Sequence, residues 1–309
     1  MISFNGVSEQ LYIPEKQIKD IYNASKGKSK KEQAQIVKAN VEHYRKELDK
    51  RLKNRHFGYA TPENMGWVNM CDHQQMSGYS VGIVYIEDVF YPMVPGNVVN
   101  AYTYDFPVRM RGVPNLDIDR LFRRDPSIAD DIIKLGEYMI EKEGIRALCS
   151  ACGFFGNFHK QVAAALDIPV ALSSLVQINW IRSVIKPGQK IGILTADKSS
   201  FTPVLLENVG VTDDSDLIVK DLRHGEHISA ILEYRGEFDN SKVKEEVVGA
   251  ALELLEEDAD IGAILLECSD MPPYAYAVQQ ATQLPVFDFI TLIKWLHNGT
   301  TQKPYSGWI

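Results

Sequence analysis

The chain has 309 residues, of which 45% are hydrophobic and 24% are charged, the usual balance of a globular protein. This composition excludes a disordered chain, a coiled-coil rod and a collagen-like repeat. The apolar runs fall far short of the ~20 residues that a membrane span needs, and the first residues lack the basic and apolar blocks of a secretion signal. Four cysteines are too few for a disulfide framework. We therefore expect a cytoplasmic protein with no membrane partner.

The net charge of −8 is divided unevenly along the chain. Residues 1–56 contain thirteen lysines and arginines against seven acidic residues, whereas residues 57–309 contain twenty against thirty-four. The larger part is thus strongly acidic, and an acidic surface repels the phosphates of nucleic acid. We therefore expect no nucleic-acid partner.

Residues 1–79 are predicted to form a helical extension. Ser29 and Glu32 have the spacing of a capping box, and apolar side chains recur after them at helical intervals. A helix with one apolar stripe must bury it against the rest of the chain or against a second subunit, and the second case would make a homodimer. The stripe consists of Ile36, Val37, Val41, Tyr44, Leu48 and Leu52.

Beyond residue 80, short apolar runs alternate with helix-length segments. Nearly all-apolar strands between helices are typical of buried parallel sheets with helices on both faces, so the predicted fold class is α/β. Strands are predicted at residues 81–86, 145–151, 170–172, 190–194, 263–266 and 286–289. Helices are predicted at residues 128–142, 157–166, 242–256 and 275–282.

This part of the chain contains an internal repeat. Residues 81–88 resemble residues 191–197, and residues 145–152 resemble residues 261–268. A Pro-Val pair begins seventeen positions after each of the two cysteines that end the second pair of segments, Cys152 and Cys268. The repeat predicts two α/β domains of similar construction.

We expect the first domain to comprise residues 80–187 plus 285–309 and the second to comprise residues 188–284. In open α/β sheets, ligands bind at the carboxyl ends of the strands. Cys152 and Cys268 both follow a predicted strand, so we expect them to meet across one cleft between the domains.

Two facing cysteines suit proton transfer at a carbon atom. Each precedes a predicted helix, whose unpaired N–H groups can lower a thiol pKa from its usual ~8.5 and can also hold a carboxylate. One thiolate would then remove an α-proton while the opposite thiol returns a proton to the other face. We expect the Gly153 N–H and Ser269 to hold the substrate carboxylate. This chemistry requires no metal and no organic cofactor.

Four motifs together resemble the aspartate/glutamate/hydantoin racemase superfamily. They are Ser150-Ala-Cys-Gly-Phe-Phe-Gly156, Ser173-Ser-Leu175, Gly192-Ile-Leu-Thr-Ala-Asp197 and Leu266-Glu-Cys-Ser-Asp-Met-Pro-Pro-Tyr274. The resemblance covers about residues 80–295. It implies two pseudo-symmetric Rossmann-like domains with parallel sheets and an active-site cleft between them. It also implies cofactor-independent racemisation by a cysteine pair, here Cys152 and Cys268.

The chain departs from the amino-acid racemases of this superfamily beside both cysteines. Those enzymes typically carry Asn-Thr after the first cysteine and Thr-Glu after the second, where this chain has Gly153-Phe154 and Ser269-Asp270. We expect these four residues to contact the substrate. The Cys-Gly-Phe sequence is similar to that of the superfamily's algal-type lyases, which cleave dimethylsulfoniopropionate.

Other polar and cysteine residues have two interpretations each. Glu87 and Asp88 end a strand of the first half, and Thr195 and Asp197 hold the matching place in the second. These four residues either contact the ligand or belong to plain turns. We interpret Cys149 as a structural core residue, and the pair Cys149 and Cys152 as neither a redox dithiol nor half of a zinc site. We interpret His224-Gly-Glu-His227 as a polar loop, Cys71-Asp-His73 as packing, and Tyr91-Pro-Met-Val-Pro-Gly96 as a rigid loop near the cleft mouth. No metal site is expected.

The leading hypothesis is a cofactor-independent racemase or epimerase that acts at the α-carbon of a small carboxylate or amino acid. The first alternative is a lyase or decarboxylase of the same superfamily, which uses one cysteine thiolate as a base. The second is a non-catalytic, two-lobed protein that binds a small molecule. The product distinguishes the two enzymes, and the reactivity of the thiols distinguishes the binding protein.

Overall fold

The computed structural model describes residues 15–52 and 74–309, and the chain divides into two units, residues 1–56 and 57–309. In the first unit, helices α2 (Glu15–Ser25) and α3 (Lys30–Leu52) contact each other. The predicted capping box is confirmed, because the Ser29 N–H donates to Glu32 Oε2 at 2.9 Å and the Glu32 N–H donates to Ser29 Oγ at 3.4 Å. The segment Cys71-Asp-His73 lies outside the described residues.

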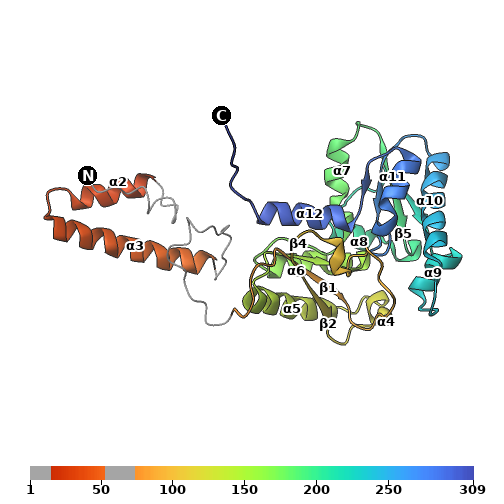
Figure 1. The fold of residues 1–309 in the computed structure, drawn as a ribbon, viewed down its shortest axis with the longest axis horizontal. Coiled ribbons are helices and arrows are strands. Elements are labelled where there is room, and N and C mark those ends of the chain that lie inside the picture. Colours follow the sequence, from red (N-terminus) through yellow and green to blue (C-terminus); the bar gives the residue numbers. More distant parts are fainter. Residues whose placement is uncertain (1–14, 53–73) are drawn as a thin grey trace. The chain divides into compact units, whose positions relative to one another are not determined.

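The second unit contains two parallel four-stranded sheets (Figure 1). The first has the order β2-β1-β3-β4, and the second has the order β6-β5-β7-β8. Since corresponding strands occupy corresponding places, the predicted repeat is confirmed. The strands are β1 (Val81–Ile86), β2 (Val108–Val113), β3 (Ala147–Ser150), β4 (Val170–Ala171), β5 (Lys190–Thr195), β6 (Leu217–Asp221), β7 (Ile261–Leu266) and β8 (Val286–Phe287).

Helices cover both faces of the sheets. The α-helices are α4 (Ile118–Phe122), α5 (Ser127–Glu143), α6 (His159–Ala165), α7 (Ile178–Val184), α8 (Pro203–Asn208), α9 (Glu226–Leu232), α10 (Asn240–Glu257), α11 (Ala275–Thr282) and α12 (Phe289–Thr300). Short 3₁₀ helices are η1 (Ala101–Thr103), η2 (Gly153–Phe158), η3 (Ser174–Gln177), η4 (Lys198–Ser200) and η5 (Pro272–Tyr274). None of the helices in residues 15–52 and 74–309 is both long enough and apolar enough to cross a membrane.

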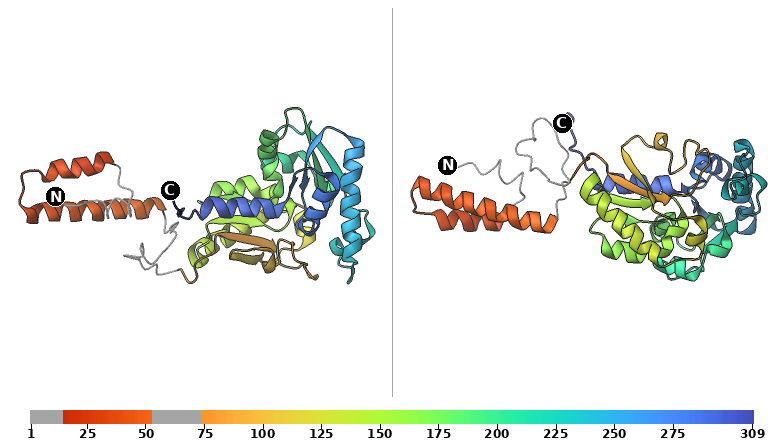
Figure 2. Two further views of the ribbon diagram at one scale, coloured as in Figure 1. Left: turned by 45° about the horizontal axis from the view of Figure 1, so that its top comes forward. Right: turned by 90° about the horizontal axis from the view of Figure 1, so that it is seen from below.

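Alternate residues of β1 and β3 enter different cores. Val84 and Leu148 pack with α5, whereas Ile83 and Cys149 pack with α12, so these two helices lie on opposite faces of the first sheet (Figure 2). The core on the α5 face also includes Ile191 and other residues of the second sheet. One continuous apolar core therefore joins the two halves and holds the strand ends of both sheets in a fixed relation.

The last strand differs from the sequence prediction. Residues 285–309 were expected to return to the first domain, but β8 pairs with β7 in the second sheet. Only α12 packs on the first sheet, through Phe289, Leu292, Ile293 and Leu296. Because β8 is a two-residue strand that directly precedes the helix cap Asp288, the apolar pattern alone does not separate it from α12.

Candidate active site between two cysteine loops

A pocket lies among the segments that follow β1, β3, β5 and β7, at the carboxyl ends of both sheets. It encloses about 770 Å³, part of which is open to solvent. Cys152 and Cys268 both line it. Its aromatic side chains are Tyr85, Tyr91, Phe122, Phe154 and Tyr234, and its charged residues are Asp197, Arg223, Glu267 and Asp270. A partly open pocket with this mostly apolar lining and a few polar groups is suited to a small organic ligand.

Cys152 is the residue that precedes η2, and the N–H groups of Phe154 and Phe155 interact with its sulfur. We expected such donors to lower the thiol pKa. Instead, burial and then the charge of Glu267 raise the pKa of Cys152, and the two N–H groups offset only part of this. The surroundings of Cys152 therefore favour the thiol over the thiolate.

Cys268 forms a pair with Asp270. The Cys268 Sγ donates to Asp270 Oδ2 at 3.6 Å. The other carboxylate oxygen, Oδ1, accepts hydrogen bonds from the Tyr91 hydroxyl and, at 2.6 Å, from Asn97 Nδ2. Burial, followed by the charges of Asp270 and Glu267, raises the pKa of Cys268 well above its usual value. Asp270 thus accepts a hydrogen bond from the Cys268 thiol, and Tyr91 and Asn97 from the first half of the molecule fix its position.

The segment 91–97 brings these donors across the cleft. It was predicted to form a rigid loop near the cleft mouth, and Tyr91 and Met93 do line the pocket. At Gly96, with φ of +101°, the loop runs so close to η5 that a Cβ atom would lie 2.7 Å from Pro273 Cα. Only glycine fits both the backbone conformation and this contact, which explains how the loop reaches Asp270.

The remaining loop residues line the pocket as predicted from the sequence. Phe154 packs against Phe122 of α4, with ring centroids 5.4 Å apart, and makes this side of the pocket apolar. Gly153 and Ser269 also line the pocket. The Ser269 hydroxyl donates to the Ala151 carbonyl at 3.3 Å, so it ties the two cysteine loops together.

Two predicted contact residues do not line the pocket. Glu87 is exposed, and its Oε2 accepts a hydrogen bond from the Asn115 N–H at 3.1 Å, away from the cleft. Thr195 is fully buried and donates to Glu267 Oε2 at 3.0 Å. Neither residue therefore reaches the pocket, because the turn after β1 directs Glu87 toward β2 and because Thr195 lies behind Glu267.

Sequence reasoning missed Glu267 although this residue directly precedes Cys268 in the quoted motif. Its side chain is buried, and Oε2 accepts hydrogen bonds from Thr195 and, at 3.5 Å, from the Ala196 N–H. Its other oxygen, Oε1, has no hydrogen-bond partner among the described residues. Burial raises the pKa of Glu267 to about 7. The available signal was an acidic residue directly before Cys268 in the motif, but the sequence does not show that its side chain is buried.

The residues predicted to be structural lie outside the pocket. Cys149 is completely buried beside α12, and burial raises its pKa to about 12. His224 and His227 do not line the pocket. Within residues 15–52 and 74–309, no group of three or more His, Cys, Asp or Glu side chains is placed to hold a metal ion.

The comparisons with known proteins all point to one protein family. The family model described as Asp/Glu/Hydantoin racemase matches residues 110–296. A dimethylsulfoniopropionate lyase from Durusdinium sp. clade D is 30% identical over 235 residues, which are 74% of this chain and 77% of that protein. Dimethylsulfoniopropionate lyase 7 from Emiliania huxleyi is 29% identical over 222 residues, or 69% of this chain and 64% of that protein.

The fold also matches a solved structure of this group. The crystal structure of allantoin racemase from Pseudomonas fluorescens superposes with a TM-score of 0.50 at 15% identity, covering 74% of this chain and 99% of that one. Two parallel sheets with a cysteine loop from each thus define a two-lobed α/β fold like that of this racemase. The chain belongs to the Asp/Glu/hydantoin racemase family.

Proposed function

We propose that this protein is a lyase that eliminates a neutral sulfide from a small sulfonium carboxylate such as dimethylsulfoniopropionate. The observation that carries the proposal is the composition of the pocket, where aromatic rings surround a thiol paired with a carboxylate. The relatives named as dimethylsulfoniopropionate lyases support it. No metal or organic cofactor is needed for the reaction.

The aromatic lining favours a substrate that carries a positive charge. Tyrosine and phenylalanine rings attract a cation over their faces, by about 0.5–2 kcal/mol each when water is excluded. Five such residues line the pocket, together with more acidic than basic side chains. Aspartate or glutamate, each with two carboxylates, would meet repulsion here, whereas a sulfonium group would be attracted.

The substrate's own charge would also prepare the base. Burial and neighbouring carboxyl groups raise the pKa of Cys268. A bound sulfonium ion offsets that effect, because a nearby positive charge favours the thiolate. The Cys268 proton then passes to Asp270, whose Oδ2 already accepts it in a hydrogen bond at 3.6 Å.

The elimination follows from this arrangement. The Cys268 thiolate removes the proton next to the carboxylate, and the released electron pair forms a double bond to the neighbouring carbon. The bond from that carbon to sulfur breaks, and dimethyl sulfide leaves with its electron pair. The products are an alkene carboxylate, a neutral sulfide and one proton. Cys268 keeps the proton taken from the substrate, and Asp270 releases the original cysteine proton to solvent. Backbone N–H groups at Gly153 and Ser269 would hold the carboxylate while charge develops on it.

Racemisation is the second candidate, because the opposite thiol, Cys152, also lines the pocket. It shares the first step, proton removal next to a carboxylate, and differs only in whether a leaving group departs. An α-proton returned by Cys152 to the other face would invert the carbon instead.

Turnover in heavy water distinguishes the two reactions. The enzyme is incubated with sulfonium carboxylates, amino acids, hydantoins and malonates while proton spectra are recorded. We expect an alkene carboxylate and dimethyl sulfide from the sulfonium substrate. Exchange of an α-proton without fragmentation would establish racemisation instead, and release of carbon dioxide would indicate a decarboxylase. Silence across the panel would favour the non-catalytic binding protein.

Cysteine variants test the assignment of the base. We expect Cys268→Ser to lower kcat by about 10²–10⁴-fold, the usual contribution of a general base. Cys149→Ala is the matched control, since Cys149 is a buried cysteine outside the pocket, and it should keep most of the activity. A fully active Cys268→Ser enzyme would refute the mechanism.

A further inference from the structure

Glu267 occupies an unusual place between the two cysteine loops. It precedes Cys268 in the chain, and its carboxyl lies against Gly153, the residue after Cys152. A Cβ atom on Gly153 would lie only 1.6 Å from Glu267 Oε1, so that oxygen fills the space where any other residue would have a side chain. The side chain is 1% exposed, and Oε1 accepts no hydrogen bond from the described residues. A buried carboxylate oxygen without a donor is costly if it is charged.

The groups that face Glu267 make its charge still less favourable. Asp197 after β5 and Asp270 after β7 both raise its pKa, as does burial, while Thr195 and the Ala196 N–H lower it through hydrogen bonds. The thiol of Cys268 follows it directly in the chain, and the thiol of Cys152 faces it from the end of β3. Among the described residues that line the pocket, only Arg223 has a basic side chain, and it is not among the groups that shift the pKa of Glu267.

A substrate carboxylate would add one more negative charge to this cluster. The Gly153 N–H, its expected donor, belongs to the residue that Glu267 Oε1 contacts. Two carboxylates so close together in a low-dielectric site do not both remain ionised, and one of them takes up a proton. Of the two carboxylates, Glu267 gains more from protonation, because it is buried and its Oε1 has no hydrogen-bond partner among the described residues.

We propose that Glu267 is a positioning residue that takes up a proton when the substrate carboxylate binds, so that a neutral acid lies beneath the Cys152–Gly153 loop during the reaction. This inference rests on the proposed function, which places a carboxylate in this pocket. The consequence extends to the thiols. Because the charge of Glu267 is one cause of the high thiol pKa values, its neutralisation lowers them and favours the thiolate form of the base.

The test is proton uptake on binding of propionate, a carboxylate with no leaving group and therefore no turnover. Calorimetric titrations at pH 8 are made in buffers with different enthalpies of ionisation, which together give the number of protons bound. Since the pKa of Glu267 is about 7, the Glu267 carboxyl of the free enzyme is mostly ionised at pH 8. We expect wild type to take up about one proton, and its affinity for propionate to fall about tenfold for each pH unit above 7.

Two variants and one control make the result specific. Glu267→Gln should bind propionate without proton uptake and with an affinity that no longer falls with pH. Thr195→Val removes the hydrogen bond that favours the ionised carboxyl, so the onset of uptake should move to higher pH. Glu87→Gln changes an exposed carboxyl outside the pocket and should behave like wild type.

The inference is overturned if wild type binds propionate without taking up a proton, if it fails to bind propionate, or if Glu267→Gln takes up the proton as wild type does. These results are separate from the test of the proposed function. Proton uptake without release of a sulfide would support the role of Glu267 and refute the lyase function. An active lyase without proton uptake would do the reverse.

Discussion

Gly153 and Glu267 are complementary in shape, and each limits what the other can be. The racemases that the chain resembles typically have asparagine at the position of Gly153. Here the space of that side chain is taken by the Glu267 carboxyl, because Oε1 would lie 1.6 Å from a Cβ atom on Gly153. The polar group next to the first cysteine thus comes from the opposite loop.

Gly153→Ala should therefore displace Glu267. Overpacking of a buried site costs about 1–3 kcal/mol, and we expect a loss of that size in the free energy of unfolding together with a large loss of activity. The double variant Gly153→Ala/Glu267→Ala removes the clash, so its loss of stability should be smaller than the sum of the single losses. Urea denaturation of the four proteins measures this coupling. Additive effects would contradict the close contact.

Glu143 is a second buried carboxyl, but with the opposite electrostatic setting. It ends α5 and accepts hydrogen bonds from Arg111 and Arg109 of β2, both of which are partly exposed. Burial alone would raise its pKa, yet the bonds from the two arginines outweigh burial and lower it to about 2. The pair of arginines therefore stabilises an ionised carboxylate at the edge of the first sheet.

Glu143→Gln should destabilise the fold by about 1–3 kcal/mol at pH 7, because it removes the carboxylate that accepts hydrogen bonds from the two guanidinium groups. The folded pKa lies below the usual 4.5, so the stabilisation is present above pH 4.5 and is lost as the pH falls toward 2. Urea denaturation at pH 7 and at pH 3 should show a smaller difference between wild type and variant at the lower pH. An equal difference at both would contradict the ion pair.

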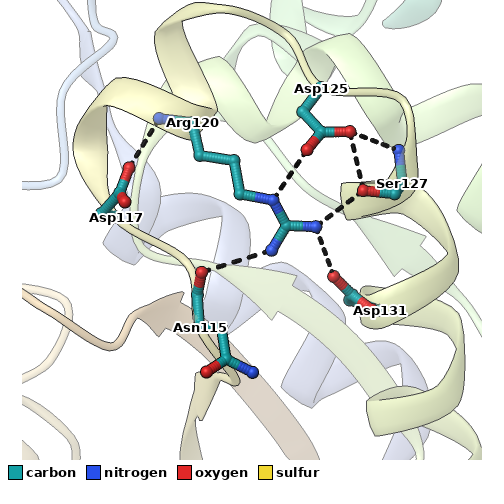
Figure 3. A network of polar contacts seen from close by, with 6 residues as sticks. All are labelled: Asn115, Asp117, Arg120, Asp125, Ser127 and Asp131. Atoms are coloured by element: carbon teal, nitrogen blue, oxygen red, sulfur yellow. Dashed lines mark hydrogen bonds and ion pairs between the residues drawn. The ribbon is translucent and has the colours of Figure 1, made fainter.

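Helix α4 is a short element that one side chain holds in place. Figure 3 shows Arg120 at the centre of a polar network. Its guanidinium donates to Asp125 at 2.9 Å, to Asp131 and Ser127 at 2.7 Å each, and to the Asn115 carbonyl at 3.3 Å. These partners lie before α4, after it and on the first turns of α5. The network thus fixes a five-residue helix that is too short to be stable alone.

Arg120→Met should loosen α4 and with it one wall of the pocket, since Ile118 and Phe122 of this helix are lining residues. We expect a rise in KM with a smaller change in kcat, and faster amide hydrogen exchange in residues 117–123. Lys242→Met removes an exposed pair with Glu245 and is the matched control, with a change in stability within about 0.5 kcal/mol. Unchanged exchange in α4 would refute the role of the network.

Edge and central strands differ in how far the sequence predicts them. The central strands β1, β3, β5 and β7 are almost completely buried and appear in the sequence as apolar runs. The edge strands β2 and β6 were not predicted, since they are half-buried and carry charged side chains such as Arg109, Arg111 and Lys220. Their pairing depends on a neighbouring strand that is distant in the chain.

At the scale of the whole molecule, each of the two units is expected to have its own role. Residues 57–309 contain the sheets, the pocket and the apolar cores, so we expect a chain that lacks residues 1–56 to keep its activity and its unfolding temperature. If the apolar stripe of the amino-terminal helices forms a homodimer, light scattering will show the full chain as a dimer and the shortened chain as a monomer. A dimer that survives the truncation would place the interface on the α/β unit instead.

The sequence by itself determined the features that depend on neighbouring residues and on repetition. The capping box at Ser29, the central strands, the α/β repeat and the loop position of both cysteines follow from local spacing and periodicity. Only the tertiary structure decided which side chains enter the pocket. Glu87 turns away, Thr195 supports Glu267, and Tyr91 crosses from the first half to Asp270. These outcomes depend on contacts between residues 28, 72 and 179 positions apart, through hydrogen bonds and steric limits that no local pattern encodes.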